Sequence, residues 1–156
     1  MNPTDRHVRL LQLLQQALEE MAFVLTDERD TPPASFDGWL EATLRFAGPP
    51  DGSLLIYAAP DVARELAENL LAVDDVEPQL VDDAAIHDAL GELANVAAGV
   101  LLDEIFGADG SYALKNVSVC DASLEARARA KSDASWSASL VTDTGGELDI
   151  AFVVTP

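Results

Sequence analysis

Three polar residues with helical spacing are the first candidates for chemistry in this sequence. Asp88, Glu92 and Asn95 follow one another at intervals of four and three residues. On an α-helix this spacing places Glu92 and Asn95 within about 40° of Asp88, on the face opposite Leu90 and Leu93. Such a stripe offers two carboxylates and an amide to another molecule rather than to the core.

Small residues surround this stripe. Gly99 lies on it, and Gly91 and Ala98 flank it. Each glycine in a helix interior costs roughly 1 kcal/mol relative to alanine, so two of them indicate a close approach by another backbone. Two simpler interpretations remain open: the polar residues are only solvated, or the glycines pack against another helix of the same domain.

Other chemistries have weaker signals in the sequence. His7 and His87 lie far apart, and no Ser-His-Asp, Cys-His or zinc-ligand spacing is present. Cys120 follows a predicted strand, and we expect it to belong to the core rather than to act as a nucleophile. Asp88 and Glu92 alone are too few ligands for a divalent ion, so we predict no metal site.

Composition excludes several classes of function. The chain has 156 residues, is 49% hydrophobic and contains one cysteine, which predicts a single domain over residues 1–156 without an internal disulfide. Its 28 acidic and nine basic side chains give a net charge of −19, so we expect neither nucleic acid nor an anionic membrane as a partner. No signal peptide or membrane-spanning run is recognised, and we expect a cytoplasmic protein.

Hydrophobic periodicity predicts the elements that position the stripe. Helices are expected from Thr4 to about Asp27, from Asp61 to about Leu71, and from Asp82 or Asp83 to Phe106, where Gly107 ends the helix. Strands are expected at 39–46, 53–59, 112–119, 136–142 and 147–154. Residues 27–38 are expected to be a loop, 73–79 a connector, and 121–135 a loop or an exposed edge strand.

The order of these elements predicts the fold class. Short hairpin links favour an antiparallel sheet, so we expect an α+β fold with long helices packed on one face of the sheet. Each half of the chain begins with a long helix that is followed by a pair of strands. This similarity suggests an internal duplication.

The stretch from His87 to Gly99, HDALGELANVAAG, resembles the signature of the CheC/CheX/FliY family of bacterial chemotaxis phosphatases, most closely CheX. That signature is Asp or Ser, three residues, Glu, two residues, Asn, and a more distant proline. Asp88, Glu92 and Asn95 match it in register. The preceding segment, residues 46–71, is similar to the family's strand, turn, strand and helix.

The resemblance implies a phosphatase that hydrolyses the aspartyl-phosphate of a phosphorylated, CheY-like receiver domain. Asn95 would orient the attacking water, because an amide both donates and accepts hydrogen bonds. Glu92 would pair with the receiver's lysine and fix the docking angle. The surface that the receiver approaches would consist of Asp88, Gly91, Ala98 and Gly99. The protein would need no cofactor of its own, since the receiver supplies Mg²⁺, and a homodimer through the sheet is possible in this family.

Two positions depart from the family pattern. Ser118 stands at the proline position, and Ala22 stands where a second site on the first helix would need an asparagine. The second departure predicts one site at most. The first keeps an alternative open, a non-catalytic module that binds a receiver or a second copy of itself. A structural domain without receiver partners is a third possibility, and it would leave the motif register and the glycines unexplained.

The net charge also makes a prediction about binding. Receiver active sites are acidic, so a protein at −19 should repel them at long range. We therefore expect receiver binding to strengthen as salt rises from low levels.

Overall fold

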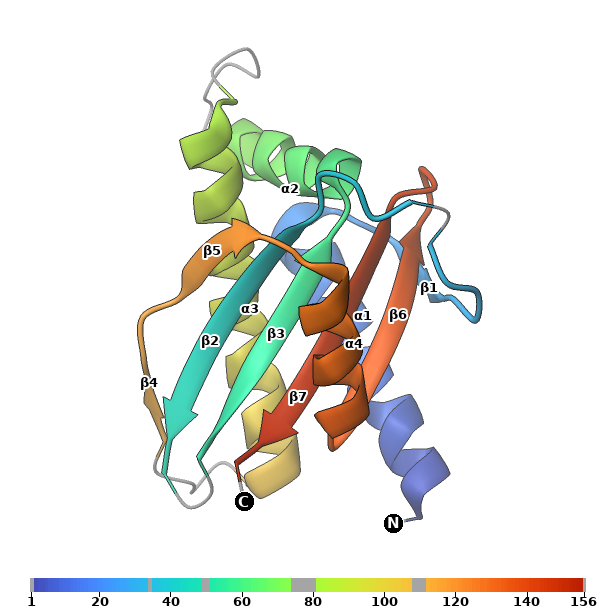
Figure 1. Cartoon of the computed structure of the whole chain (residues 1–156), viewed down its shortest axis with the longest axis vertical. Helices are drawn as coiled ribbons and strands as arrows, with labels where there is room; N and C mark the ends of the chain where they lie inside the picture. Colours follow the sequence, from blue (N-terminus) through green and yellow to red (C-terminus); the bar gives the residue numbers. More distant parts are fainter. Residues whose placement is uncertain (1, 34, 49–50, 74–80, 108–111, 156) are drawn as a thin grey trace.

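The computed structural model describes residues 2–33, 35–48, 51–73, 81–107 and 112–155. Within these ranges the chain forms four helices and one seven-stranded antiparallel sheet (Figure 1). The helices are α1 (Pro3–Ala22), α2 (Pro60–Val73), α3 (Asp83–Phe106) and α4 (Leu124–Asp133). The strands are β1 (Thr26–Glu28), β2 (Leu40–Ala47), β3 (Gly52–Ala58), β4 (Ala113–Leu114), β5 (Ser118–Asp121), β6 (Trp136–Thr142) and β7 (Glu147–Val154). The predicted α+β class is confirmed; that residues 1–156 form one domain stays a prediction.

The strand order is β1-β6-β7-β3-β2-β4, with β5 also paired to β2. Each half of the chain supplies one hairpin, β2–β3 or β6–β7, and the two hairpins meet where β3 pairs with β7. Strand β1 of the first half extends the second hairpin, while β5 of the second half extends the first. This reciprocal exchange supports the internal duplication that the sequence suggests.

The main core lies between the sheet and the long helices. Helices α1 and α3 lie against one face of the sheet, and α2 crosses its upper end in Figure 1. Alternate side chains of β3 and β7, among them Ile56 and Ile150, point into this core with Leu90 and Leu93 of α3. Each such buried Leu or Ile contributes about 1.5–3 kcal/mol, so this layer holds α3 firmly in place.

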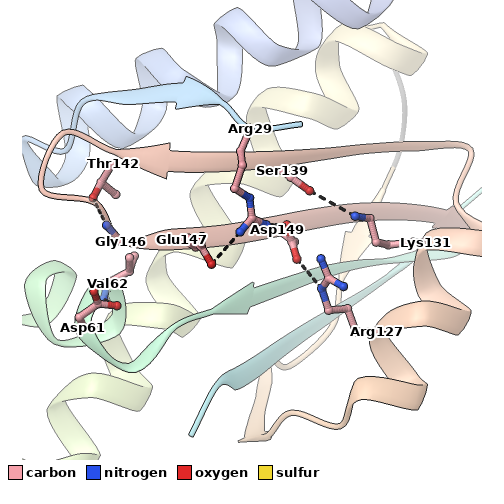
Figure 2. Close-up of polar contacts among 10 residues, drawn as sticks. All are labelled: Arg29, Asp61, Val62, Arg127, Lys131, Ser139, Thr142, Gly146, Glu147 and Asp149. Carbon is pink, nitrogen blue, oxygen red and sulfur yellow. Dashed lines mark hydrogen bonds and ion pairs between the residues drawn. The ribbon is translucent and has the colours of Figure 1, made fainter. Parts of the chain in front are cut away.

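The opposite face of the sheet is partly covered by α4, where the prediction of a loop or edge strand for residues 121–135 was wrong. Ser123 caps this helix by accepting a hydrogen bond from the Ala126 amide at 3.0 Å. The helix is anchored by Arg127, which is 8% exposed and pairs with the buried Asp149 of β7. Arg29 pairs with the other oxygen of Asp149 at 2.7 Å, so the carboxylate lies between two guanidinium groups (Figure 2).

Three further expectations need correction. Helix α1 ends at Ala22 rather than near Asp27, because Phe23 adopts a left-handed conformation with φ of 55°. The segment after it is not all loop, since β1 pairs with β6. The expected strand at 112–119 is divided into β4 and β5, and residues 74–79 of the expected connector lie outside the described residues. Among the described helices none combines the length and the apolar character needed to cross a bilayer.

Candidate functional site

Helix α3 presents the polar stripe to solvent as predicted. The helix begins after Asp82, whose carboxylate accepts a hydrogen bond from the Ala85 amide at 2.8 Å, and it ends at Gly107. Its 24 residues leave exposed the side chains of Asp88, Glu92 and Asn95. None of these three side chains has an ion pair or hydrogen bond with another described residue. They are therefore free to contact another molecule.

The stripe borders a shallow hollow between α3 and the segment that leads into β5. We call it the α3 hollow; its volume is about 460 Å³. It is lined by His87, Asp88, Gly91, Glu92, Asn95, Val117 and Val119. In Figure 1 the segment of β4 and β5 runs along the outer side of β2, at the edge of the sheet. The hollow is thus a polar helix face with an apolar wall of two valines.

Gly91 has a structural reason to be a glycine. It is buried, and a Cβ added to it would lie 3.1 Å from Cγ1 of Val117, closer than ordinary van der Waals contact. The glycine therefore lets the segment before β5 lie directly against α3. One of the simpler interpretations was that the glycines pack within the domain. This applies to Gly91, but its neighbour, Val117, belongs to a segment at the edge of the sheet and not to another helix.

The open stripe is narrower than the sequence predicted. Ala98 is 0% exposed, so its methyl group faces the core and cannot contact a partner directly. Gly99 is exposed, and a Cβ built on it would meet nothing within 4 Å. The physical reason for the correction is that β5 and the sheet cover the flank of α3 on which Gly91 and Ala98 lie. Of the stripe and its flanks, Asp88, Glu92, Asn95 and Gly99 are exposed.

Strand β5 separates this hollow from the other face of the sheet. Ser118, at the family's proline position, pairs with Thr43 of β2, and its side chain lies on the opposite side of the strand from Val117 and Val119. Cys120 is exposed, which contradicts its expected place in the core. Partial burial and the nearby Glu41 carboxylate raise the pKa of the Cys120 thiol, which disfavours the reactive thiolate.

Sequence reasoning missed the wall of the hollow and one of its polar residues. His87 also lines the hollow, and Val117 and Val119 complete it from the neighbouring segment. Nothing in the local pattern of the two valines indicates α3 as their neighbour. Within the described ranges, no group of three or more His, Cys, Asp or Glu side chains is placed to hold a metal ion.

The chain is similar to known proteins both in sequence and in structure. The family described as "Chemotaxis phosphatase CheX" matches residues 40–137. No curated protein matches the sequence significantly. The chain is similar to the crystal structure of CheX from Desulfovibrio desulfuricans, with a TM-score of 0.66, 15% identity, and coverage of 97% of this chain and 99% of that chain.

Two further solved structures are similar to the same extent. One is the CheX–CheY–BeF₃–Mg²⁺ complex from Borrelia burgdorferi, with a TM-score of 0.68, 15% identity, and coverage of 96% of this chain and 98% of that chain. The other is CheX from Vibrio vulnificus, with a TM-score of 0.67, 17% identity, and coverage of 94% and 95%. At these identities the likeness establishes a shared fold.

Proposed function

The chain belongs to the chemotaxis phosphatase CheX family, and on that premise we propose that it hydrolyses the aspartyl-phosphate of a CheY-like receiver, with Glu92 and Asn95 as catalytic residues. One observation carries the proposal. The motif residues Asp88, Glu92 and Asn95 are exposed together at the α3 hollow, and none is bound to the rest of the described protein. A stripe that served only to pack α3 would be buried.

The proposed chemistry is an in-line displacement at phosphorus. A water oxygen forms a bond to phosphorus while the bond to the aspartyl oxygen breaks, which releases inorganic phosphate and the free carboxylate. The Asn95 amide accepts a hydrogen bond from this water and donates one to the phosphoryl group, so that it holds the water in line. Glu92, one helical turn earlier, pairs with the receiver's lysine and sets the docking angle.

The partner supplies what this chain lacks. The relative from Borrelia burgdorferi forms a complex with CheY, BeF₃ and Mg²⁺, which supports a CheY-like receiver as the partner and the receiver as the source of Mg²⁺. Gly99 leaves room for a receiver loop to approach the stripe. A homodimer also stays a prediction; β1 lies at one edge of the described sheet, and β4 and β5 lie at the other.

The test uses receivers from the same organism, each phosphorylated in the presence of Mg²⁺. We expect one receiver to release phosphate faster with the wild-type protein, and Asn95→Ala to reduce that acceleration by about 10²–10³-fold while binding is retained. Gln12→Ala removes an exposed amide elsewhere, on α1, and should change nothing. Loss of activity in both variants, or full activity of Asn95→Ala, would refute the assignment.

The second candidate function is a non-catalytic module that binds a receiver. Ser118 favours it, because the family's proline is replaced in the strand that flanks the α3 hollow. In that case the wild-type protein binds one receiver in a calorimetric titration but accelerates phosphate release from none. Restoring the residue by Ser118→Pro would then be the next variant to assay.

A further inference from the structure

A second hollow lies on the face of the sheet that is turned away from α3. It lies between α4 and β5, and its volume is about 510 Å³, within the range of about 300–1,000 Å³ that is typical of small-molecule sites. We call it the α4 groove. Its floor includes a row of three residues that pair across neighbouring strands, Ser118 of β5, Thr43 of β2 and Leu55 of β3. Two of the three carry hydroxyl groups that can donate hydrogen bonds.

The charges in this groove differ from those of the chain as a whole. Two cations, Arg45 and Arg129, and two carboxylates, Glu41 and Asp133, line it, so its formal charge is zero in a chain of net charge −19. The ion pairs found among described residues involve His7 and other arginines, and neither Arg45 nor Arg129 has a carboxylate of a described residue within 4.0 Å. Unpaired guanidinium groups are well suited to bind a carboxylate or a phosphate through two parallel hydrogen bonds.

A buried hydroxyl group beside a carboxylate marks the other end of the groove. Tyr57 is 1% exposed, and no described residue accepts a well-aligned hydrogen bond from its hydroxyl; the Glu41 carboxylate, directly across from Tyr57 in the sheet, is the acceptor within reach. Burial and the neighbouring Glu41 carboxylate raise the pKa of Tyr57, so the hydroxyl keeps its proton and can donate it. Buried hydroxyl groups are usually hydrogen-bonded with good geometry, and a ligand atom that lies against Tyr57 and Glu41 would complete that hydrogen bonding.

We propose that the α4 groove binds a small organic anion, with its carboxylate or phosphate group on Arg45 and Arg129 and its polar body directed towards Tyr57. Glu41 does not prevent this arrangement, because Arg45 lies four residues further along β2, about 13 Å away at the rise of a strand. Glu41 also accepts a hydrogen bond from the Thr43 hydroxyl at 3.1 Å. Along β2 the groove thus has a cation at Arg45 and a carboxylate at Glu41, and on α4 the second carboxylate, Asp133, lies one turn after Arg129.

The groove and the α3 hollow share β5 as a common wall. Ser118 and Cys120 line the groove, while Val117 and Val119 line the hollow. An anion that contacts Ser118 would therefore change how Val117 lies against Gly91, because packed side chains transmit small displacements. This regulatory consequence rests on the proposed function, whereas binding in the groove does not.

Binding is tested by following backbone amide signals by NMR at constant ionic strength. The probes are orthophosphate, citrate and AMP, with adenosine as the uncharged control. We expect saturable shifts at Thr43, Leu55 and Ser118 with at least one anion and none with adenosine. Saturation by citrate alone assigns a carboxylate ligand, and saturation by AMP or orthophosphate assigns a phosphate. Shifts that rise without saturation, or that lie away from the groove, would overturn the proposal.

Charge-matched variants separate the groove from general electrostatics. Arg45→Met and Arg129→Met should each weaken binding at least about tenfold, since each removes a charge-assisted hydrogen bond. Arg6→Met removes the same charge from an exposed position on α1 and should leave the affinity within about twofold. Equal losses in all three variants would show a long-range charge effect and no site.

Tyr57→Phe gives a signature that a purely structural residue would not give. Removing a buried hydroxyl that has no well-aligned acceptor should leave the midpoint of urea unfolding unchanged or raised, yet weaken anion binding several-fold. A lower midpoint with unchanged binding would overturn the role of Tyr57 in the groove. The NMR titration needs no receiver, so the two proposals are tested independently. If no anion binds in the α4 groove, the phosphate-release result still stands. If no receiver loses phosphate faster, the anion-binding result still stands.

Discussion

Helices α1 and α3 occupy corresponding places in the two halves of the fold, and each borders a hollow beside a strand at the edge of the sheet. The α1 hollow, lined by Gln15, Glu19, Leu25, Thr26, Asp27 and Asp143, has the same volume as the α3 hollow, about 460 Å³. Gln15 and Glu19 repeat the spacing of Asp88 and Glu92. The two hollows therefore offer a comparison within one molecule.

The two helices diverge three residues after the glutamate. Asn95 is exposed in the middle of α3, whereas Ala22 is 0% exposed and is the last residue of α1. The Gln15 side chain donates a hydrogen bond to the Thr26 carbonyl at 2.8 Å, so the amide in the α1 hollow holds β1 in place. The same architecture thus has one hollow whose amide is used within the fold and one whose amide is free for a partner.

The largest expected difference between the hollows comes from their glutamates. Glu92→Ala should lower kcat/KM for phosphate release by roughly 10–100-fold, since it removes the hydrogen bond that we propose to a charged group of the receiver. Glu19→Ala removes the same charge from the exposed face of α1 and should have no effect. The measurement is the initial rate of phosphate release against receiver concentration. Equal losses in the two variants would mean that net charge, not position, matters.

Adding the missing asparagine to the α1 hollow should cost stability without creating a site. Ala22→Asn places an amide where the alanine is fully buried, so we expect the free energy of unfolding to fall by about 1–3 kcal/mol. In an Asn95→Ala background the variant should restore no phosphate release. Urea unfolding and the release assay check the two parts, and recovered turnover would show that the α1 hollow needs only its amide.

The two glycines of α3 should respond differently to alanine. Gly99→Ala meets nothing within 4 Å and should raise the free energy of unfolding by about 0.5–1 kcal/mol. Gly91→Ala should gain less, because Val117 must move, and phosphate release should fall roughly three- to tenfold as the wall of the hollow shifts. Adding Val117→Ala to Gly91→Ala should recover most of the rate. A Gly91→Ala protein with full activity would show that the position of Val117 in the wall of the α3 hollow does not affect phosphate release.

The smallest effect is expected from salt. Both hollows carry carboxylates in a chain of net charge −19, and the Debye length falls from about 30 Å to about 8 Å between 0.01 and 0.15 M salt. Receiver affinity should therefore rise a few-fold over this range, as measured by calorimetry. Affinity that decreases steadily instead would indicate a net attraction between the two surfaces.

Local patterns predicted α3 and the exposure of its polar stripe, and they failed where an element depends on distant residues. Apolar residues such as Leu90 and Leu93 recur at helical spacing, and Asp82 and Gly107 mark the two ends, so neighbouring residues contain the whole signal. In α4 the buried Arg127 is stable only because Asp149 lies beneath it. Strand β1 likewise has only three residues and exists through its pairing with β6.

The sequence by itself determined the antiparallel α+β class, the long motif helix and the side of that helix on which Asp88, Glu92 and Asn95 lie, because periodicity and capping act between near neighbours. Only the tertiary structure decided that Val117 lies against Gly91, and that Ser118 faces the α4 groove. Those contacts join segments far apart in the chain, and close packing of the whole fold selects them, which no local pattern encodes.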